Sequence, residues 1–235
     1  MIVLVTGASR GIGKTIAQEL ASLGYDLALV GRDSAALAET IASLPDTCGK
    51  AVAIPADLSE EESYAAVIAE TVAELGGLDV LVNCAGLSQA GSFTEVTPEQ
   101  WDKIFAVNAK APFFLCQEAL PYLKASAKPI VINIASVVGF KGYINQSVYS
   151  SSKHALTGFT KVFAKEVQPF GIRVHLISPG AVATEMVRQM RPDIDADELI
   201  QPAEIAELVR FLVTWEGKGT VDQLYIRRYS GLAFD

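Results

Sequence analysis

The residues of this sequence best suited to chemistry are a serine, a tyrosine and a lysine in its second half. Tyr149 and Lys153 stand four positions apart in a predicted helix, so both side chains project from one face and can reach the same ligand. Ser136 directly follows a predicted buried strand, thirteen positions before Tyr149. Taken singly, Ser136 would be an ordinary strand-end serine and Tyr149 an amphipathic helix residue with a surface hydroxyl. Whether these residues are catalytic therefore depends on the motifs in the rest of the chain.

A glycine-rich segment, Thr6 to Thr15, lies between the first predicted strand and the first predicted helix. A mononucleotide P-loop would end in its Gly13-Lys14-Thr15, but the required first glycine falls on Ala8. A hydrolase nucleophile elbow, Gly-x-Ser-x-Gly, matches residues 7–11 formally, although that elbow normally follows several strands and this one follows the first. Dinucleotide binding needs glycines that let the main chain approach a pyrophosphate, beside a helix N-terminus with free N–H groups.

The spacing of this segment, Thr-Gly-x-x-x-Gly-x-Gly, resembles that of the short-chain dehydrogenase/reductase family, and later motifs agree in order. These motifs are Asp57-Leu58, Asn83-Cys84-Ala85-Gly86, Asn108, Ser136, Tyr149-Ser150-Ser151-Ser152-Lys153 and Pro179-Gly180. The resemblance runs from residue 2 to about residue 184. Together the motifs are specific for this family, whereas each alone is weak evidence for it.

The resemblance implies an enzyme that reversibly transfers a hydride between a nicotinamide cofactor and a substrate carbonyl. Its catalytic residues would be Asn108, Ser136, Tyr149 and Lys153. Tyr149 would donate a proton to the carbonyl oxygen, and Ser136 would bind that oxygen. A free tyrosine has a pKa of about 10, so Lys153 would stabilise the phenolate while also binding the nicotinamide ribose. Asn108 would lie in a kinked helix whose main chain holds a water that passes protons toward Lys153.

The resemblance also implies the residues that bind the cofactor. Asp57 would contact the adenine, and Val182 and Thr184 the carboxamide. The full expected set is Gly7, Ser9, Arg10, Gly11, Ile12, Gly13, Arg32, Asp57, Leu58, Asn83, Ala85, Gly86, Tyr149, Lys153, Pro179, Gly180, Val182 and Thr184. The sequence departs from the family at Cys84, where a second asparagine is commoner. We expect a local change in hydrogen bonding there rather than a loss of cofactor binding.

The end of the second predicted strand indicates which cofactor is used. Enzymes that select NAD place an acidic residue there to accept the ribose hydroxyls. Here Gly31 occupies that position, Arg32 follows it, and Arg10 can converge from the glycine-rich segment. Two guanidiniums can bind a 2′-phosphate through charge-assisted hydrogen bonds. We therefore predict NADP(H); the alternative is that Arg32 is a solvated charge and Asp33 turns toward the ribose.

Strands and helices alternate along the whole chain. The expected strands are 2–5, 27–30, 51–54, 79–82, 130–134, 173–177 and 221–226, and the expected helices are 13–23, 34–43, 59 to about 76, 98 to about 123, 148–167 and 202 to about 215. Capping boxes, Ser59 to Glu62 and Thr97 to Gln100, open two of these helices. The strands are apolar without alternation, as in sheets buried on both faces.

This alternation predicts an α/β fold of the Rossmann type, a three-layer sandwich with a doubly wound, mainly parallel seven-stranded sheet and helices on both faces. No linker divides the chain, so we expect a single dinucleotide-binding domain over residues 1–235. A short substrate lid is expected at about 184–200. Ligands should bind beyond the C-terminal ends of the strands.

Composition excludes several other classes of protein. The 235 residues are 50% hydrophobic and 20% charged, which excludes disorder and a disulfide-stapled mini-protein. A net charge of −8 is the wrong sign for a protein that grips nucleic acid or an anionic membrane, so neither partner is expected. Three scattered cysteines and two histidines predict no metal site, with His154 structural and His175 in the core. No apolar run approaches ~18 residues, and we expect a cytoplasmic protein. The family implies a homodimer or homotetramer.

The substrate walls are expected at residues 137–145, 87–91 and 186–190. These ranges contain aromatic residues and two methionines, which favours a ketone or aldehyde with apolar bulk. Lys141 and Arg188 could serve an anionic substrate instead. Two alternatives stay open: a 3-oxoacyl thioester reductase of the same family, and a non-catalytic NADP-binding scaffold or sensor. The segment 224–231 lacks the usual family ending, which puts the oligomer geometry in doubt.

Overall fold

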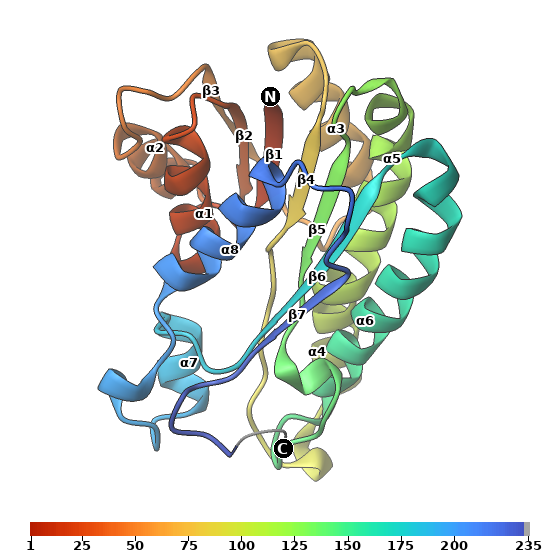
Figure 1. Ribbon diagram of the computed structural model, residues 1–235. Coiled ribbons are helices and arrows are strands. Elements are labelled where there is room, and N and C mark those ends of the chain that lie inside the picture. Colours follow the sequence, from red (N-terminus) through yellow and green to blue (C-terminus); the bar gives the residue numbers. More distant parts are fainter. Residues whose placement is uncertain (233–235) are drawn as a thin grey trace.

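A computed structural model describes residues 1–232 of the chain, which form a seven-stranded sheet flanked by helices (Figure 1). Every pair of neighbouring strands is parallel, and the strand order is β3-β2-β1-β4-β5-β6-β7. The strands are β1 (Ile2–Thr6), β2 (Asp26–Gly31), β3 (Ala51–Pro55), β4 (Val80–Asn83), β5 (Ile130–Ile134), β6 (Arg173–Pro179) and β7 (Gln223–Ile226). The predicted fold class is confirmed.

Helices cover both faces of this sheet, in two separate layers (Figure 1). One layer contains α1 (Gly11–Ala21), α2 (Ser34–Ala42) and α8 (Pro202–Thr214). The opposite layer contains α3 (Glu62–Leu75), α4 (Pro98–Phe105), α5 (Ala111–Ala125) and α6 (Ser147–Val167). The short helix α7 (Glu185–Met190) lies beyond the carboxyl end of β6, near the end of the described chain (Figure 1).

Most strands contribute alternate side chains to two apolar cores, because successive residues of a strand point to opposite faces. In β1, Val3 and Val5 pack into the core beneath α1 and α8, whereas Leu4 packs into the core beneath α3 and α5. All three are fully buried. Burial on both sides explains why the strands read as unbroken apolar runs.

Of the two capping boxes predicted from the sequence, the one that starts α4 is present and the one that starts α3 is not. The side chain of Thr97 accepts a hydrogen bond from the N–H of Gln100, and the side-chain oxygen of Gln100 accepts one from the N–H of Thr97, as predicted for α4. The prediction for α3 is wrong, since this helix begins at Glu62 without a capping side chain. Ser59 donates its N–H and its hydroxyl to the Asp57 carboxylate instead, at 2.9 and 2.8 Å. An aspartate two residues upstream thus holds Ser59 in an Asx-type turn.

The long helix expected from Pro98 is interrupted by one turn of π-helix, Ala106–Lys110, between α4 and α5. Pro112 follows this turn and lacks the N–H that would donate an α-helical hydrogen bond to the carbonyl of Asn108. A π-turn of this kind places one extra residue in the helix and is frequent at functional sites. The interruption expected at Asn108 is therefore present, as a wider turn of the helix.

In the part of the chain that the structure describes, no helix is long and apolar enough to cross a membrane.

Candidate active site

The turn between β1 and α1 is held so tightly that it requires glycine. A Cβ on Gly7, whose φ is +69°, would lie 2.8 Å from the Cα of Ala85, and a Cβ on Gly13 would lie 2.2 Å from the carbonyl oxygen of Gly7. The N–H of Ala8 donates to the carbonyl of Val30, which fixes the turn to β2. The main chain is therefore exposed directly to the space beyond the strand ends.

The N-terminus of α1 offers unpartnered main-chain donors to this space. Its N-cap residue, Arg10, makes no side-chain capping hydrogen bond, and the first helical bond runs from Lys14 to the carbonyl of Arg10. The N–H groups of Gly11, Ile12 and Gly13 precede that bond, and these residues line a cavity. Free N–H groups at a helix N-terminus suit a pyrophosphate. The residues present therefore fit a dinucleotide.

This first cavity has a volume of about 340 Å³ and follows the carboxyl ends of the strands from β3 to β5. Fourteen of the residues predicted to bind the cofactor line it: Gly7, Ser9, Arg10, Gly11, Ile12, Gly13, Arg32, Asp57, Leu58, Ala85, Gly86, Tyr149, Lys153 and Thr184. Residues outside that prediction also line it: Gly31, Ala56, Cys84, Leu87, Val107, Ile134, Ala135, Glu185 and Met186. The structure thus brings together residues that are up to 179 positions apart in the sequence.

Four of the predicted cofactor residues do not line the first cavity. Asn83 is buried behind it, where its Nδ2 donates to Oδ1 of Asn133 at 2.8 Å. The carbonyl of Pro179 accepts from the Ser136 hydroxyl at 3.3 Å, and Gly180 lines a second, adjoining cavity. Val182 is buried and bridges to Ile200. Contact between these four residues and a cofactor stays a prediction.

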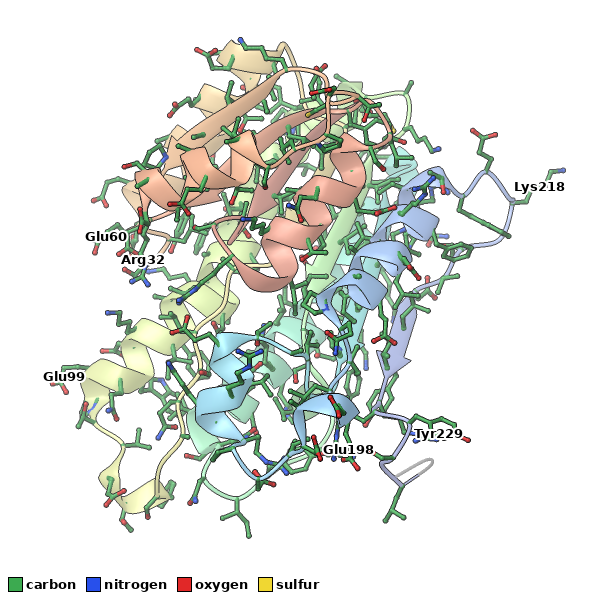
Figure 2. The ribbon with its side chains drawn as sticks, turned by 90° about the vertical axis from the view of Figure 1, so that its left-hand side faces the viewer. Arg32, Glu60, Glu99, Glu198, Lys218 and Tyr229 are labelled. Atoms are coloured by element: carbon green, nitrogen blue, oxygen red, sulfur yellow. The ribbon has the colours of Figure 1, made fainter. Side chains whose placement is uncertain are left out.

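At the adenosine end of the first cavity, the geometry disfavours an acidic residue after β2. A Cβ on Gly31 would lie 2.3 Å from the Ser9 hydroxyl, so a carboxylate side chain fits only if Ser9 moves. Arg32 is exposed and points outward at the rim, as Figure 2 shows. Asp33 caps α2, because its carboxylate accepts from the N–H of Ala36 at 3.1 Å. The alternative in which Asp33 turns toward the ribose therefore competes with a formed helix cap.

Arg10, the second expected phosphate ligand, makes an ion pair with Glu185 at the start of α7. Its Nη1 lies 2.6 Å from the Glu185 carboxylate, and both side chains are exposed. Sequence analysis does not find this contact, because the two residues are 175 positions apart. An exposed ion pair contributes only about 0–1 kcal/mol, so a phosphate can displace Glu185 at small cost.

Two further residues of the first cavity have ionisation states set by their surroundings. Hydrogen bonds from the main chain and hydroxyl of Ser59 hold the pKa of Asp57 below its ordinary value, against an opposing effect of desolvation. Desolvation raises the pKa of the Cys84 thiol to about 12, so the thiol is neutral. The N–H groups of Cys84 and Ala85 both donate to the Thr6 hydroxyl at 3.0 Å.

Tyr149 and Lys153 lie side by side on α6 and are both buried. The Lys153 ammonium donates to the carbonyl of Ile134 at 3.0 Å and lies 6.0 Å from the centre of the Tyr149 ring. Desolvation lowers the pKa of Lys153 to about 8. Desolvation also raises the pKa of Tyr149, while a hydrogen bond with Ser136 lowers it in part. The predicted triad of hydroxyl, phenol and ammonium is thus assembled.

Asn108 lies behind this triad and is completely buried. Its amide exchanges two hydrogen bonds with the main chain of Leu87, at 2.7 and 2.8 Å, and donates a third to the Ser152 hydroxyl at 3.0 Å. Ser152 in turn donates to the carbonyl of Tyr149. Asn108 therefore fixes the segment after β4 to the helix that carries Tyr149 and Lys153.

A second cavity of about 280 Å³ meets the first at Tyr149 and Met186, which line both. Ser136 and parts of the expected walls, within residues 137–143 and 186–190, line it, whereas residues 88–91 do not. The C-terminal segment also lines it, although sequence analysis assigned that segment no place in the site. Its contributing residues are Tyr225, Arg227, Arg228, Gly231 and Leu232.

The hydrolase interpretation of Ser9 finds no support in this arrangement. His154 is exposed on α6 and contacts the carbonyl of Ser150 at 2.9 Å, and His175 is buried in β6 against the carbonyl of Val221 at 2.7 Å. Neither histidine lines the first cavity, so Ser9 has no histidine base. Among residues 1–232 no cluster of three His, Cys, Asp or Glu side chains could hold a metal ion.

Comparisons with known proteins agree with this geometry. The family model for short chain dehydrogenases matches residues 1–195. The 3-oxoacyl-(acyl-carrier-protein) reductase FabG of Staphylococcus aureus is 34% identical and the alignment covers 92% of this chain and 91% of the relative. The acetoacetyl-CoA reductase of an Acinetobacter species is also 34% identical, with the same coverage.

Solved structures give the same assignment. An alcohol dehydrogenase from the archaeon Thermococcus sibiricus, complexed with 5-hydroxy-NADP, matches with a TM-score of 0.90 at 28% identity, over 99% of this chain and 98% of that chain. A metagenomic short-chain oxidoreductase in complex with NADP matches with a TM-score of 0.81 at 32% identity, over 97% and 96%. This protein therefore belongs to the short-chain dehydrogenase family and is an oxidoreductase.

Proposed function

We propose that this protein is an NADP(H)-dependent oxidoreductase that reversibly reduces the carbonyl of a ketone or aldehyde to an alcohol, with Tyr149 as general acid and base. The observation that carries the proposal is the junction of the two cavities at Tyr149. One cavity presents the donors expected for a dinucleotide phosphate, and the other contains Ser136. The two structural relatives solved with NADP and with 5-hydroxy-NADP support the choice of cofactor.

The residues that would hold the phosphates of NADP(H) come from the glycine-rich segment and from Arg32, directly after β2. The N–H groups at the start of α1 would bind the pyrophosphate, and Arg10 and Arg32 would bind the 2′-phosphate. The close approach of Gly31 to Ser9 supports NADP(H) over NAD(H), since an acidic side chain fits at that position only if Ser9 moves. When bound, NADPH supplies the hydride that reduces the carbonyl carbon.

The chain's own residues handle the proton and the developing charge. As the carbonyl carbon is reduced, negative charge grows on its oxygen, and the Tyr149 hydroxyl donates its proton there. The Ser136 hydroxyl stabilises the same oxygen through a hydrogen bond. The Lys153 ammonium stabilises the phenolate that Tyr149 becomes, because the two groups share a buried, low-dielectric site. Asn108 keeps α6 and the Leu87 segment in register, and the main chain of the interrupted helix that carries it would hold the water that returns protons to Lys153.

Replacing Tyr149 with phenylalanine tests this role directly. The loss of absorbance of NADPH would be followed with a panel of ketones, aldehydes, 3-oxoacyl thioesters and esters. We expect Y149F to abolish reduction while NADPH binding, measured by fluorescence titration, stays unchanged. Y122F, which alters an exposed tyrosine of α5, is the matched control and should retain full activity. Turnover by Y149F at the rate of Y122F would contradict the proposal.

A second candidate, a 3-oxoacyl thioester reductase, is favoured by the likeness to a 3-oxoacyl-(acyl-carrier-protein) reductase and an acetoacetyl-CoA reductase. The same panel separates it from the first candidate, because such an enzyme would reduce acetoacetyl-CoA far faster than the free ketones. A non-catalytic NADP-binding scaffold or sensor would bind NADPH and reduce nothing. The presence of both Tyr149 and Lys153 disfavours that alternative.

We also propose that the protein is a single dinucleotide-binding domain, with residues 184–200 as a short substrate lid. It would form a homodimer or homotetramer in the cytoplasm. Its partner is a small carbonyl or alcohol substrate. Exposed apolar side chains on α5 and α6, Phe113 and Val162, support self-association. Light scattering coupled to size-exclusion chromatography would give the number of subunits.

A further inference from the structure

The second cavity is lined by positive charge in an otherwise acidic protein. Lys141, Arg191, Arg227 and Arg228 line it, and none of its described lining residues is an aspartate or glutamate. The chain as a whole carries a net charge of −8. Like charges gathered in a cleft focus the field there and attract ligands of the opposite sign. This cavity is therefore suited to an anion.

Two of these cations are oriented by acidic residues that lie outside the cavity lining. Arg191 donates two hydrogen bonds to Asp193, at 2.9 and 2.7 Å, and Arg228 donates one to Glu198 at 2.7 Å. Figure 2 shows Glu198 close to the C-terminal segment that carries Tyr229. These pairs hold both guanidiniums in place beside the cavity.

Arg227 differs, because its hydrogen bonds leave its charge unneutralised. Its Nη1 donates to the carbonyls of Arg228, Tyr229 and Gly231, all of which are neutral acceptors. Within residues 1–232, its Nε and Nη2 atoms have no hydrogen-bond partner. The three bonds to the main chain fold the C-terminal segment around the guanidinium and fix its position. Arg227 is thus a rigid cation with donors to spare.

The sheet places Arg227 near the reacting carbonyl. Ile226 of β7 pairs with Pro179 of β6, and the carbonyl of Pro179 accepts the Ser136 hydroxyl at 3.3 Å. Neighbouring strands lie about 4.8 Å apart and one residue adds about 3.8 Å, so the main chain of Arg227 is within about 14 Å of the Ser136 hydroxyl. An arginine side chain spans much of that distance. One small molecule can therefore contact Tyr149, Ser136 and Arg227 at the same time.

We infer that the substrate of this site is a short oxo acid, whose carboxylate binds Arg227 while its carbonyl lies at Ser136 and Tyr149. Lys141 lines the same cavity. Although desolvation lowers the pKa of Lys141, its hydrogen bonds with Tyr143 and Tyr225 raise it more, so the ammonium stays charged. The inference rests on the proposed function, and the reaction is the carbonyl reduction described there. It narrows the ketone or aldehyde of the proposed function to one that carries a carboxylate.

A comparison of matched acids and esters tests the inference. Wild-type protein with NADPH would be assayed on 4-oxopentanoate and on its methyl ester, which differ in one charge. We expect kcat/KM to favour the acid by about 10- to 100-fold, as for a charge-assisted hydrogen bond. R227Q should reduce the ratio of acid to ester at least tenfold, and R227K should restore part of it. R210Q, which removes an exposed arginine of α8 outside both cavities, is the matched control and should keep the ratio.

Equal rates for the acid and the ester would overturn the inference, as would an R227Q variant that slows both alike. Dependence on Arg227 for acetoacetyl-CoA alone would also overturn it, since the anion would then be a carrier phosphate. Calorimetric titration of 4-oxopentanoate into the protein with NADP⁺ separates the two proposals. If no carbonyl compound is reduced but wild type binds 4-oxopentanoate and R227Q does not, the proposed reaction fails and the carboxylate site stands. Absence of binding overturns the site.

Discussion

Lys153 controls the rate of carbonyl reduction through its charge, and the size of this effect follows from the structure. Its Nζ lies 6.0 Å from the centre of the Tyr149 ring, over which phenolate charge spreads, and both groups are buried. At an effective dielectric constant of about 20, two unit charges at this separation interact by about 3 kcal/mol. Since about 1.4 kcal/mol corresponds to a factor of ten, loss of the ammonium should slow reduction about 100-fold.

The pH dependence follows from the same group. Desolvation lowers the pKa of Lys153 to about 8 in the cofactor-free protein, so the ammonium is present below pH 8 and absent above it. Because kcat/KM reports the ionisation of the free enzyme, kcat/KM for NADPH should be constant at lower pH and fall as pH rises through about 8. K153M should be slow at every pH and show no inflection there.

The assay is the initial rate of NADPH oxidation between pH 6 and 10, with NADPH affinity measured separately by fluorescence. That second measurement distinguishes lost chemistry from lost contact with the ribose. K165M, which removes an exposed lysine of the same helix, should behave as wild type. A flat wild-type profile across pH 8, or a K153M variant within fivefold of wild type, would refute the electrostatic argument.

Three other substitutions test the remaining parts of the site. R32D should lower kcat/KM for NADPH about 10- to 100-fold and invert the preference over NADH, because a charge-assisted contact becomes repulsive; an unchanged ratio of the two cofactors would contradict the assignment. E185Q should lower KM for NADPH a fewfold and leave KM for NADH unchanged, because it releases Arg10 from an exposed ion pair. Equal changes in KM for both cofactors would show that the substitution alters the lid and not the binding of the 2′-phosphate. N108A should lower the free energy of unfolding in urea by about 2–4 kcal/mol, since it leaves Leu87 and Ser152 without buried partners; a loss under 1 kcal/mol would contradict this.

The architecture could be predicted from the sequence because its signals are local. Unbroken apolar runs such as Ile130–Ile134 indicate strands buried on both faces, and the four-residue spacing of Tyr149 and Lys153 places both side chains on one helix face. Gly7 and Gly13 were informative for the same reason, since their spacing reflects one tight turn.

The features that escaped prediction depend on contacts between distant segments. Nothing near Arg10 in the sequence indicates that Glu185 will lie beside it, and nothing near Arg227 indicates that the chain returns along β6 to line the second cavity. The cap expected at Ser59 failed because a competing acceptor, Asp57, stands two residues away. Local patterns find an element, whereas its partners depend on the packing of the whole chain.

The π-helical turn between α4 and α5 makes the number of residues in this stretch as important as their identity. Each residue of an α-helix advances the chain by about 100° around its axis. The wider π-turn accommodates one extra residue, so deleting one residue between 106 and 110 would restore a regular helix and leave α4 and α5 close to their present orientation. The residues of the turn itself would shift around the axis by up to about that angle, so Asn108 would turn away from Leu87. Such a deletion should therefore spare the packing of α5 on the sheet and damage the active site.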